Sequence, residues 1–155
     1  MRRKDFEVTD PQAIDEIIRA CHCCRLGFAD GEDCYIVPLS FGFCHEVARV
    51  LYFHSAREGR KLELARKYGR AAFEMDCGYT LHRAEAPCKY SCAVRSVMGS
   101  GSIREVLDPA EKREALRHIL NHTAGPQQWR FPEGAENTVT ILKLTVEAIR
   151  CKAHG

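Results

Sequence analysis

The sequence predicts a mainly β domain of the α+β class, in which an antiparallel sheet curls into a barrel and helices lie at its edges. Several runs of residues have strand character, three stretches carry helix-start signals, and short turns join successive strands. Short turns favour antiparallel pairing, and such a sheet buries its apolar face by curling or by packing against helices. The 155 residues are enough for one such domain, spanning 1–155.

The first helix is predicted to begin at Pro11, after Asp10. Aspartate is a favoured N-cap because its carboxylate accepts hydrogen bonds from free N–H groups, and proline suits the first helical position. The apolar residues at the spacing of one helical face are Ile14, Ile17, Ile18 and Cys21. Cys21 is therefore expected to be the last apolar residue of this helix.

A β-hairpin is expected next, with its turn at Asp30-Gly31, a dipeptide that favours tight hairpin turns. Residues 25–43 are rich in strand formers on both sides of this turn. A third strand, 49–55, follows the short connection 44–48.

The second helix is expected directly after that strand. Ser55 followed by Glu58 fits the capping-box pattern, in which a hydroxyl and a carboxylate three residues later satisfy free N–H groups. Leu62 and Ala65 share a face, and Gly69 stands where a helix end favours positive φ. The sequence therefore predicts a helix that is capped by Ser55 and ends at Gly69.

Residues 70–78 are expected to form a short buried strand, 78–90 a loop without clear periodicity, and 91–107 a long strand. Gly99 and Gly101 within the long strand indicate a β-bulge or a close approach by another segment.

The last helix and the last strand complete the pattern. Asp108, Pro109 and Glu111 form a strong start for a helix over 110–122. The final strand is expected over 137–151, and the residues predicted on one of its faces are Leu142, Leu144, Val146 and Ala148.

Composition excludes several classes of function. The formal net charge is +2, and no block of five or more like charges occurs, so we expect no nucleic-acid partner. No apolar run follows the basic N-terminus, and no segment is long enough to span a membrane. We therefore expect a cytoplasmic protein without membrane contact, whose nine cysteines are reduced thiols.

A cysteine-rich segment, 20–34, contains four of the nine cysteines and one histidine. Zinc sites usually use C-x-x-C pairs, because that spacing lets two sulfurs reach one tetrahedral ion. Here the order is Cys21-x-Cys23-Cys24, so we expect no metal site and interpret these cysteines as small apolar residues. A thiol switch or metal sensor at residues 21–24 is the alternative.

The stretch HSAREGRK (54–61) has the residue types of a phosphate site. A helix N-terminus presents free N–H groups and the positive end of the helix dipole, and both favour an anion. The polar side chains at this helix start are His54, Ser55, Arg57, Arg60 and Lys61. Hydroxyl, N–H groups and cations together would hold a phosphate. The alternative is a solvated face with extended basic side chains.

A family resemblance rests on several motifs taken together. These are VPLS (37–40), YFHSAREGRK (52–61), RSVMGSG (95–101), FPEGA (131–135) and ILKL (141–144). From about residue 14 to residue 152 the chain resembles the pyridoxamine 5′-phosphate oxidase-like family of split-barrel flavoproteins, and within it the nitroimidazole-resistance (Nim) reductases. The resemblance implies a six-stranded antiparallel split β-barrel with flanking helices, which binds FMN at the interface of a homodimer.

The resemblance also implies roles for individual residues. The isoalloxazine ring would lie against Val37, Pro38, Leu39 and Ser40. The ribityl phosphate would be surrounded by His54, Ser55, Arg60 and Lys61. A second copy would contribute Arg95 and Ser96, and Trp129 would close over the flavin. His54 is the candidate catalytic residue, because Nim-type proteins have a histidine in the matching HSA motif.

The implied activity is that of an FMN-dependent oxidoreductase that reduces small electrophiles such as nitroaromatics, with electrons from a nicotinamide or another reduced carrier. Oxidation of pyridoxamine phosphate is not expected, because residues 148–155 lack the additional basic residues that the oxidases use for the substrate phosphate. The alternative is a protein of the same fold that binds flavin, haem or a deazaflavin coenzyme without turnover.

Overall fold

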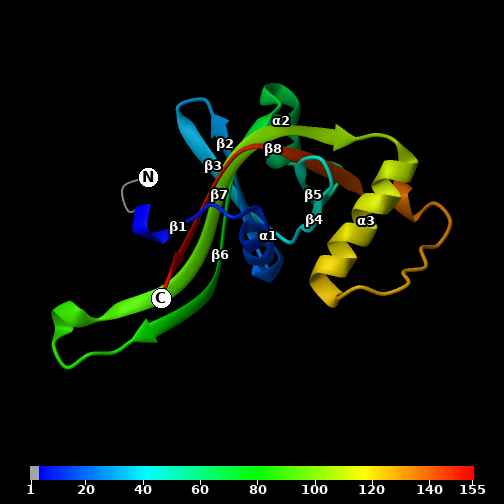
Figure 1. Cartoon of the computed structure of the whole chain (residues 1–155). Helices are drawn as coiled ribbons and strands as arrows, with labels where there is room; N and C mark the ends of the chain where they lie inside the picture. Colours follow the sequence, from blue (N-terminus) through cyan, green and yellow to red (C-terminus); the bar gives the residue numbers. More distant parts are fainter. Residues whose placement is uncertain (1–3) are drawn as a thin grey trace.

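The computed structural model describes residues 4–155 and shows one antiparallel sheet with three α-helices packed around it (Figure 1). The helices are α1 (Pro11–Ala20), α2 (Arg60–Tyr68) and α3 (Pro109–Ala124). The strands are β1 (Glu7–Val8), β2 (Cys24–Asp30), β3 (Asp33–Leu39), β4 (Gly42–His45), β5 (Arg49–Ser55), β6 (Arg70–His82), β7 (Ser91–Val106) and β8 (Thr140–His154). Within residues 4–155, none of the helices has the length and apolar character that a membrane crossing needs.

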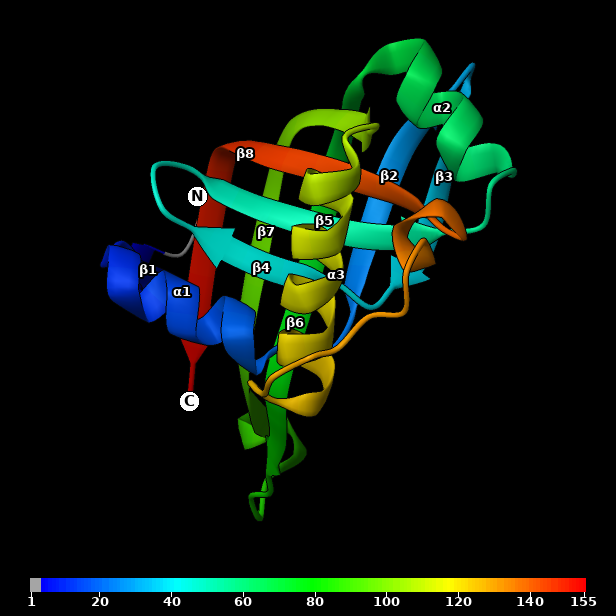
Figure 2. The same ribbon diagram turned by 90° about the vertical axis from the view of Figure 1, so that its right-hand side faces the viewer.

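The strand order explains the shape of the sheet. It runs β3-β2-β6-β7-β8-β5-β4, and β1 pairs with β8. β3 and β4 are the two ends of this order, yet only Ser40 and Phe41 separate them in sequence. Three steps between successive Cα atoms span at most about 11 Å, so the sheet must curl until its edges meet. Figure 2 shows this curl, with α3 lying across β4 and β5. The predicted split-barrel class is confirmed.

The strand count exceeds the six strands that the resemblance implies. The run up to residue 43, expected as one arm of the hairpin, forms two strands, because β3 pairs with β2 whereas β4 pairs with β5. Phe41, fully buried at the corner, packs against His122 with ring centroids 4.1 Å apart and ring planes tilted by 42°. The other additional strand is the two-residue β1.

The apolar core lies inside the curled sheet, and α1 and α2 close it. The buried residues that the two helices contribute are Ile14, Ile17, Ile18, Leu62, Leu64 and Ala65. A second, smaller cluster lies under α3, which buries Ala115 and Ile119 against β5 and β8. The sheet and its three helices are therefore held together by two apolar clusters.

The predicted starts of α1 and α3 are confirmed. Asp10 accepts a hydrogen bond from the N–H of Ala13 at 2.8 Å, and Asp108 accepts one from the N–H of Glu111 at 2.7 Å. Cys21 follows α1 as its C-cap and is fully buried, as the helical pattern predicts.

β6 extends beyond the predicted strand. The segment 78–82, expected as loop, continues β6, and Thr80, Leu81 and His82 pair with β7 after a register shift that follows Cys77. Gly78 takes a φ of +70° at this irregularity. The extension projects from the rest of the sheet (Figure 1), and residues 78–82 are all exposed, Tyr79 and Leu81 among them. The extension therefore has no buried face. For this reason its sequence lacks the alternation of apolar and polar residues by which a strand is recognised.

β8 also departs from its predicted face. Leu142 and Leu144 point into the core, but Ala148 is exposed. The reason is a bulge in β8 at Glu147, which has no strand-pairing partner in β7: Gly101 pairs with Val146, and Ser100 pairs with Ala148. The predicted bulge near Gly101 is confirmed. A Cβ at Gly101 would lie 1.9 Å from Thr145 O, so the close approach is confirmed as well.

Candidate functional site

The junction between β5 and α2 is the first part of the candidate site. The predicted capping box is wrong: Ser55 remains in β5, where it pairs with Thr140 of β8, and α2 begins five residues later. Its N-cap is Gly59, whose φ of +131° favours glycine and which makes no side-chain hydrogen bond. Strand pairing therefore outweighs the local capping signal, and the helix start has no side-chain cap.

Two of the first N–H groups of α2 have no backbone acceptor within residues 4–155. The N–H groups of Leu62 and Glu63 donate to Gly59 O at 3.0 and 3.3 Å. Those of Arg60 and Lys61 have no backbone acceptor within residues 4–155. Free N–H groups at the positive end of a helix dipole favour an anion.

Ser55 carries the most informative side chain at this junction. The residue is 5% exposed, and its hydroxyl has no hydrogen-bond partner among residues 4–155. Leaving a buried hydroxyl unpaired costs about 1–3 kcal/mol, so native proteins rarely do so without a reason. The hydroxyl is therefore a candidate contact for a ligand.

The basic side chains around the junction differ in what they already contact. Arg57 donates to Asn137 O, and Arg60 forms ion pairs with Asp30 and Glu63. Lys61 is half-buried and makes no ion pair within the described chain. Lys61 is thus the cation of the predicted set that is free to pair with an anion.

His54 and Ser55 lie on opposite faces of β5. Successive strand residues point to opposite faces of a sheet, and His54 is exposed whereas Ser55 is buried. One chain therefore does not direct both side chains toward a single phosphate.

β3 carries three of the four residues predicted to line a flavin ring, and Ser40 follows it. β3 is an edge strand that is hydrogen-bonded to β2 alone. Val37 and Leu39 are half-buried against the core, while Pro38 and Ser40 are exposed. Proline fits here because one side of an edge strand needs no N–H donor. The strand thus presents exposed side chains and one unpaired backbone edge.

Arg95 and Ser96 lie on β7, where they pair with Cys77 and Asp76 of β6. This part of β6 and β7 runs away from α2 (Figure 1). A single chain does not bring these two residues to the β5–α2 junction.

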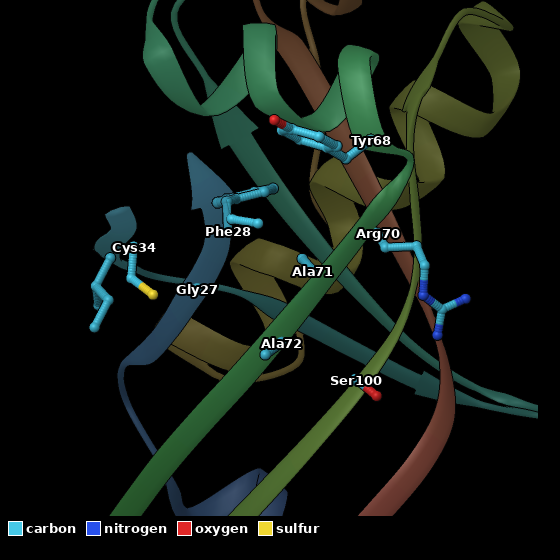
Figure 3. Close-up of a pocket in the computed structure, with 10 residues that line it drawn as sticks. Gly27, Phe28, Cys34, Tyr68, Arg70, Ala71, Ala72 and Ser100 are labelled. Carbon is cyan, nitrogen blue, oxygen red and sulfur yellow. The ribbon is translucent and has the colours of Figure 1, made fainter. Parts of the chain in front are cut away.

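An apolar hollow of about 570 Å³ lies on the outer face of β2, β3, β6 and β7, under Tyr68 at the end of α2 (Figure 3). A second hollow of about 470 Å³ adjoins it and shares part of its lining. We call this surface the small-residue face, formed by Gly27, Ala29, Ile36, Ala72, Met98 and Ser100. Ile36 is 66% and Met98 43% exposed. Exposed large apolar side chains beside small ones are typical of an association surface.

Sequence analysis missed the small-residue face. Glycine, alanine or serine stands at outward positions of β2, β6 and β7, but only the sheet order places these strands side by side.

Comparison with known proteins decides the family. The family model described as pyridoxamine 5′-phosphate oxidase matches residues 10–153. The chain belongs to the pyridoxamine 5′-phosphate oxidase family. Membership in this family agrees with the curled antiparallel sheet and with the resemblance of the motifs. In a separate comparison, no curated protein matches the chain.

Solved structures of similar fold extend this finding. A candidate 5-nitroimidazole antibiotic resistance protein from Bacteroides thetaiotaomicron is 30% identical, with a TM-score of 0.81 over 95% of this chain and 86% of that one. The flavocytochrome Anf3 from Azotobacter vinelandii is 18% identical, with a TM-score of 0.80 over 100% and 72% of the two chains. An FAD- and haem-binding protein from Mycobacterium smegmatis is 14% identical, with a TM-score of 0.80 over 96% and 74%. At 18% and 14% identity, the flavocytochrome and the FAD- and haem-binding protein show only that their fold is the same as that of this chain.

Trp129, in this member of the family, lies in the connection that follows α3. Its indole N–H donates a 2.7 Å hydrogen bond to Asn121 Oδ1 of α3, and its side chain is half-buried. The bond fixes the connection to α3; closure of Trp129 over a flavin stays a prediction.

Two of the four cysteines in the segment 20–34 lie in the barrel core, whereas Cys23 is half-buried and Cys34 is exposed. Cys21 and Cys24 are fully buried, and Cys21 Sγ donates to Ile17 O at 3.2 Å. Burial raises the pKa of both thiols far above the ordinary range, which disfavours the thiolate that reacts or binds metal. Among residues 4–155, no three His, Cys, Asp or Glu side chains are placed to hold a metal ion. Cys21 and Cys24 therefore act as small apolar residues, as predicted.

Proposed function

We propose that the chain is an FMN-dependent oxidoreductase that reduces small electrophiles such as nitroaromatics. The observation that carries this proposal is the buried Ser55 hydroxyl, which has no partner within residues 4–155 and precedes a helix whose start has no side-chain cap from that part of the chain. This hydroxyl, the free N–H groups of Arg60 and Lys61, and the unpaired Lys61 cation match the donors that a phosphate monoester takes. The Bacteroides relative, a candidate nitroimidazole-resistance protein, supports the substrate class.

In this proposal, each residue of the site has a separate task. Ser55, Arg60 and Lys61 bind the phosphate, while Val37, Pro38, Leu39 and Ser40 position the flavin ring and exclude water from one of its faces. FMN, when bound, supplies the electron-pair transfer itself. His54, exposed at the end of β5, is the proposed catalytic contact with the substrate.

The proposal includes a homodimer. Arg95 and Ser96 of one chain would complete the flavin site of the other, and Trp129 would close over the ring. The small-residue face is the proposed contact surface, because glycine, alanine and serine let a second sheet approach closely beside Ile36 and Met98. The electron donor would be a nicotinamide or another reduced carrier, and the protein would be cytoplasmic. Neither nucleic acid nor membrane would be a partner.

Purified protein reconstituted with FMN tests the proposal. We expect a bound-flavin absorption spectrum, rapid reduction by NADH or NADPH, and reoxidation by a nitroimidazole. Lys61→Ala should weaken FMN binding, whereas Lys67→Ala, which removes the same charge from the last turn of α2, should not. A protein that retains no FMN contradicts the proposal. A haem spectrum, or a bound flavin that nitro compounds do not reoxidise, would favour the non-catalytic carrier.

A further inference from the structure

We infer that Asp30 competes with the flavin phosphate for Arg60, and thereby sets how tightly the β5–α2 junction holds that phosphate. This inference rests on the proposed function and names the residue that regulates the affinity of its site.

Every guanidinium nitrogen of Arg60 already has a carboxylate partner. Nε donates to Asp30 Oδ2 at 2.8 Å, Nη2 donates to Asp30 Oδ1, and Nη1 donates to Glu63 Oε2 at 2.9 Å. Arginine offers this same two-pronged geometry to carboxylates and to phosphates. A phosphate that arrives at the start of α2 therefore meets an arginine whose best donor pair is occupied by an anion.

The β2–β3 turn delivers that anion. Asp30 ends β2 and pairs with Asp33 across a two-residue turn, in which Gly31 takes a φ of +69°. The ion pair joins residues 30 positions apart, so it links the tip of this hairpin to the first turn of α2. Asp33, beside Asp30 on the same tip, makes no ion pair within the described residues.

The Asp30–Arg60 pair is weak enough to be exchanged. The Arg60 side chain is 49% exposed and that of Asp30 is 23% exposed, and water screens such pairs strongly. A phosphate monoester carries up to two negative charges and three strong acceptor oxygens, so it is the better partner for the guanidinium. Breaking the Asp30–Arg60 ion pair costs free energy, which lowers the affinity of the site for phosphate. The displaced Asp30 carboxylate also stays nearby and repels the phosphate, because both are negatively charged. Ser55 and Lys61 carry no such opposing partner.

The test compares FMN with riboflavin, which lacks the phosphate, in fluorescence-quenching titrations at low ionic strength. Asp30→Asn should bind FMN about two- to five-fold more tightly than the native protein, the range that exposed ion pairs support, and should bind riboflavin unchanged. Asp33→Asn, the matched control, removes the same charge from the same tip and should change FMN affinity less. Residue 30 is the last residue of β2 and lies outside the two-residue turn at Gly31 and Glu32, so Asp30→Asn leaves the turn residues unchanged.

Three outcomes overturn the inference. Asp30→Asn could weaken FMN binding or leave it unchanged, it could shift FMN and riboflavin by the same factor, or Asp33→Asn could reproduce its effect. In all three the native protein still binds FMN, and the proposed function stands. A native protein that binds neither flavin overturns the proposed function together with the inference. Arg60→Ala in the Asp30→Asn background should abolish the gain, which confirms that Arg60 carries it.

Discussion

Arg49 Nε donates a 2.7 Å hydrogen bond to Oδ1 of Asp15, a carboxylate that is only 8% exposed. The second oxygen of Asp15 lies 2.5 Å from His45 Nδ1, and Arg49 also donates to Pro11 O at the start of α1. The β4–β5 hairpin is thus bound to α1 through one buried carboxylate, which sequence analysis did not identify.

Asp15→Asn is expected to destabilise the fold by about 1.5–3 kcal/mol at pH 7, the range for hydrogen bonds to charged groups. Urea denaturation measures the loss. Asp33→Asn, at the exposed first residue of β3, is the control and should change the free energy of unfolding little. Equal stability of the Asp15→Asn variant and the native protein would contradict the structural role of this carboxylate.

The same carboxylate predicts a pH dependence. Burial alone would raise the pKa of Asp15, but hydrogen bonds from His45 and Arg49 outweigh burial and hold the pKa below its ordinary value of 3.8. Because the folded pKa is the lower one, the unfolded chain binds the proton first, and Asp15 contributes fully to stability above about pH 5. That contribution falls as the pH drops below about 4 and through the folded pKa. Denaturation measured from pH 7 to pH 3 should show a shallower decline for Asp15→Asn than for the native protein.

Gly101→Ala is expected to destabilise the protein by about 3 kcal/mol or more. The new Cβ would lie 1.9 Å from Thr145 O, a backbone atom that cannot move without disturbing the bulge in β8. Ser100→Ala, at the neighbouring position that already has a Cβ, should be nearly neutral. Thermal unfolding of the two variants side by side checks this, and equal melting temperatures would show that the bulge tolerates a side chain.

Asp108→Ala should lower stability by about 1 kcal/mol, because the N–H of Glu111 loses the acceptor that now lies 2.7 Å away. For a domain of this size the melting temperature should fall by about 2–4 °C. Asp108→Ser keeps an N-cap acceptor and should recover most of the loss. Equal losses in the two variants would show that the cap does not stabilise α3.

Ser55→Ala should separate ligand binding from stability. The native hydroxyl is buried without a partner, so its removal should leave the flavin-free protein equally or more stable. FMN affinity should fall about ten-fold or more, because a hydrogen bond to a charged phosphate is lost, while riboflavin affinity stays the same. Loss of stability without loss of FMN affinity would show that the hydroxyl serves the fold.

Ala72→Arg should convert the proposed homodimer into monomers and weaken FMN binding, because it places a long cation in the small-residue face. Analytical ultracentrifugation and FMN titration measure the two effects. Ala124→Arg, at an exposed alanine near the end of α3, is the control for the added charge. A native protein that is monomeric with FMN bound would contradict the proposed interface.

The sequence by itself determined the features that depend on contacts within a few residues. Asp10 and Asp108 cap their helices through N–H groups three residues away, and the hairpin predicted at Asp30-Gly31 forms, with its two turn residues one position later at Gly31 and Glu32. The fold class followed from the order of these elements, and the close approach at Gly101 was detectable because a glycine interrupts a strand pattern. For the two caps and the hairpin turn, the physical cause lies in neighbouring residues, whereas the segment that approaches Gly101 is the distant strand β8.

Tertiary structure decided everything that depends on distant partners. Ser55 has a capping pattern, yet pairing with Thr140 keeps it in β5 and leaves its hydroxyl buried without a partner. The Arg60–Asp30 ion pair spans 30 positions, and the small-residue face exists only because β2, β6 and β7 are neighbours in the sheet. Strand pairing commits many backbone hydrogen bonds at once, so it outweighs a single local signal, and no local pattern reveals which partner a strand will take.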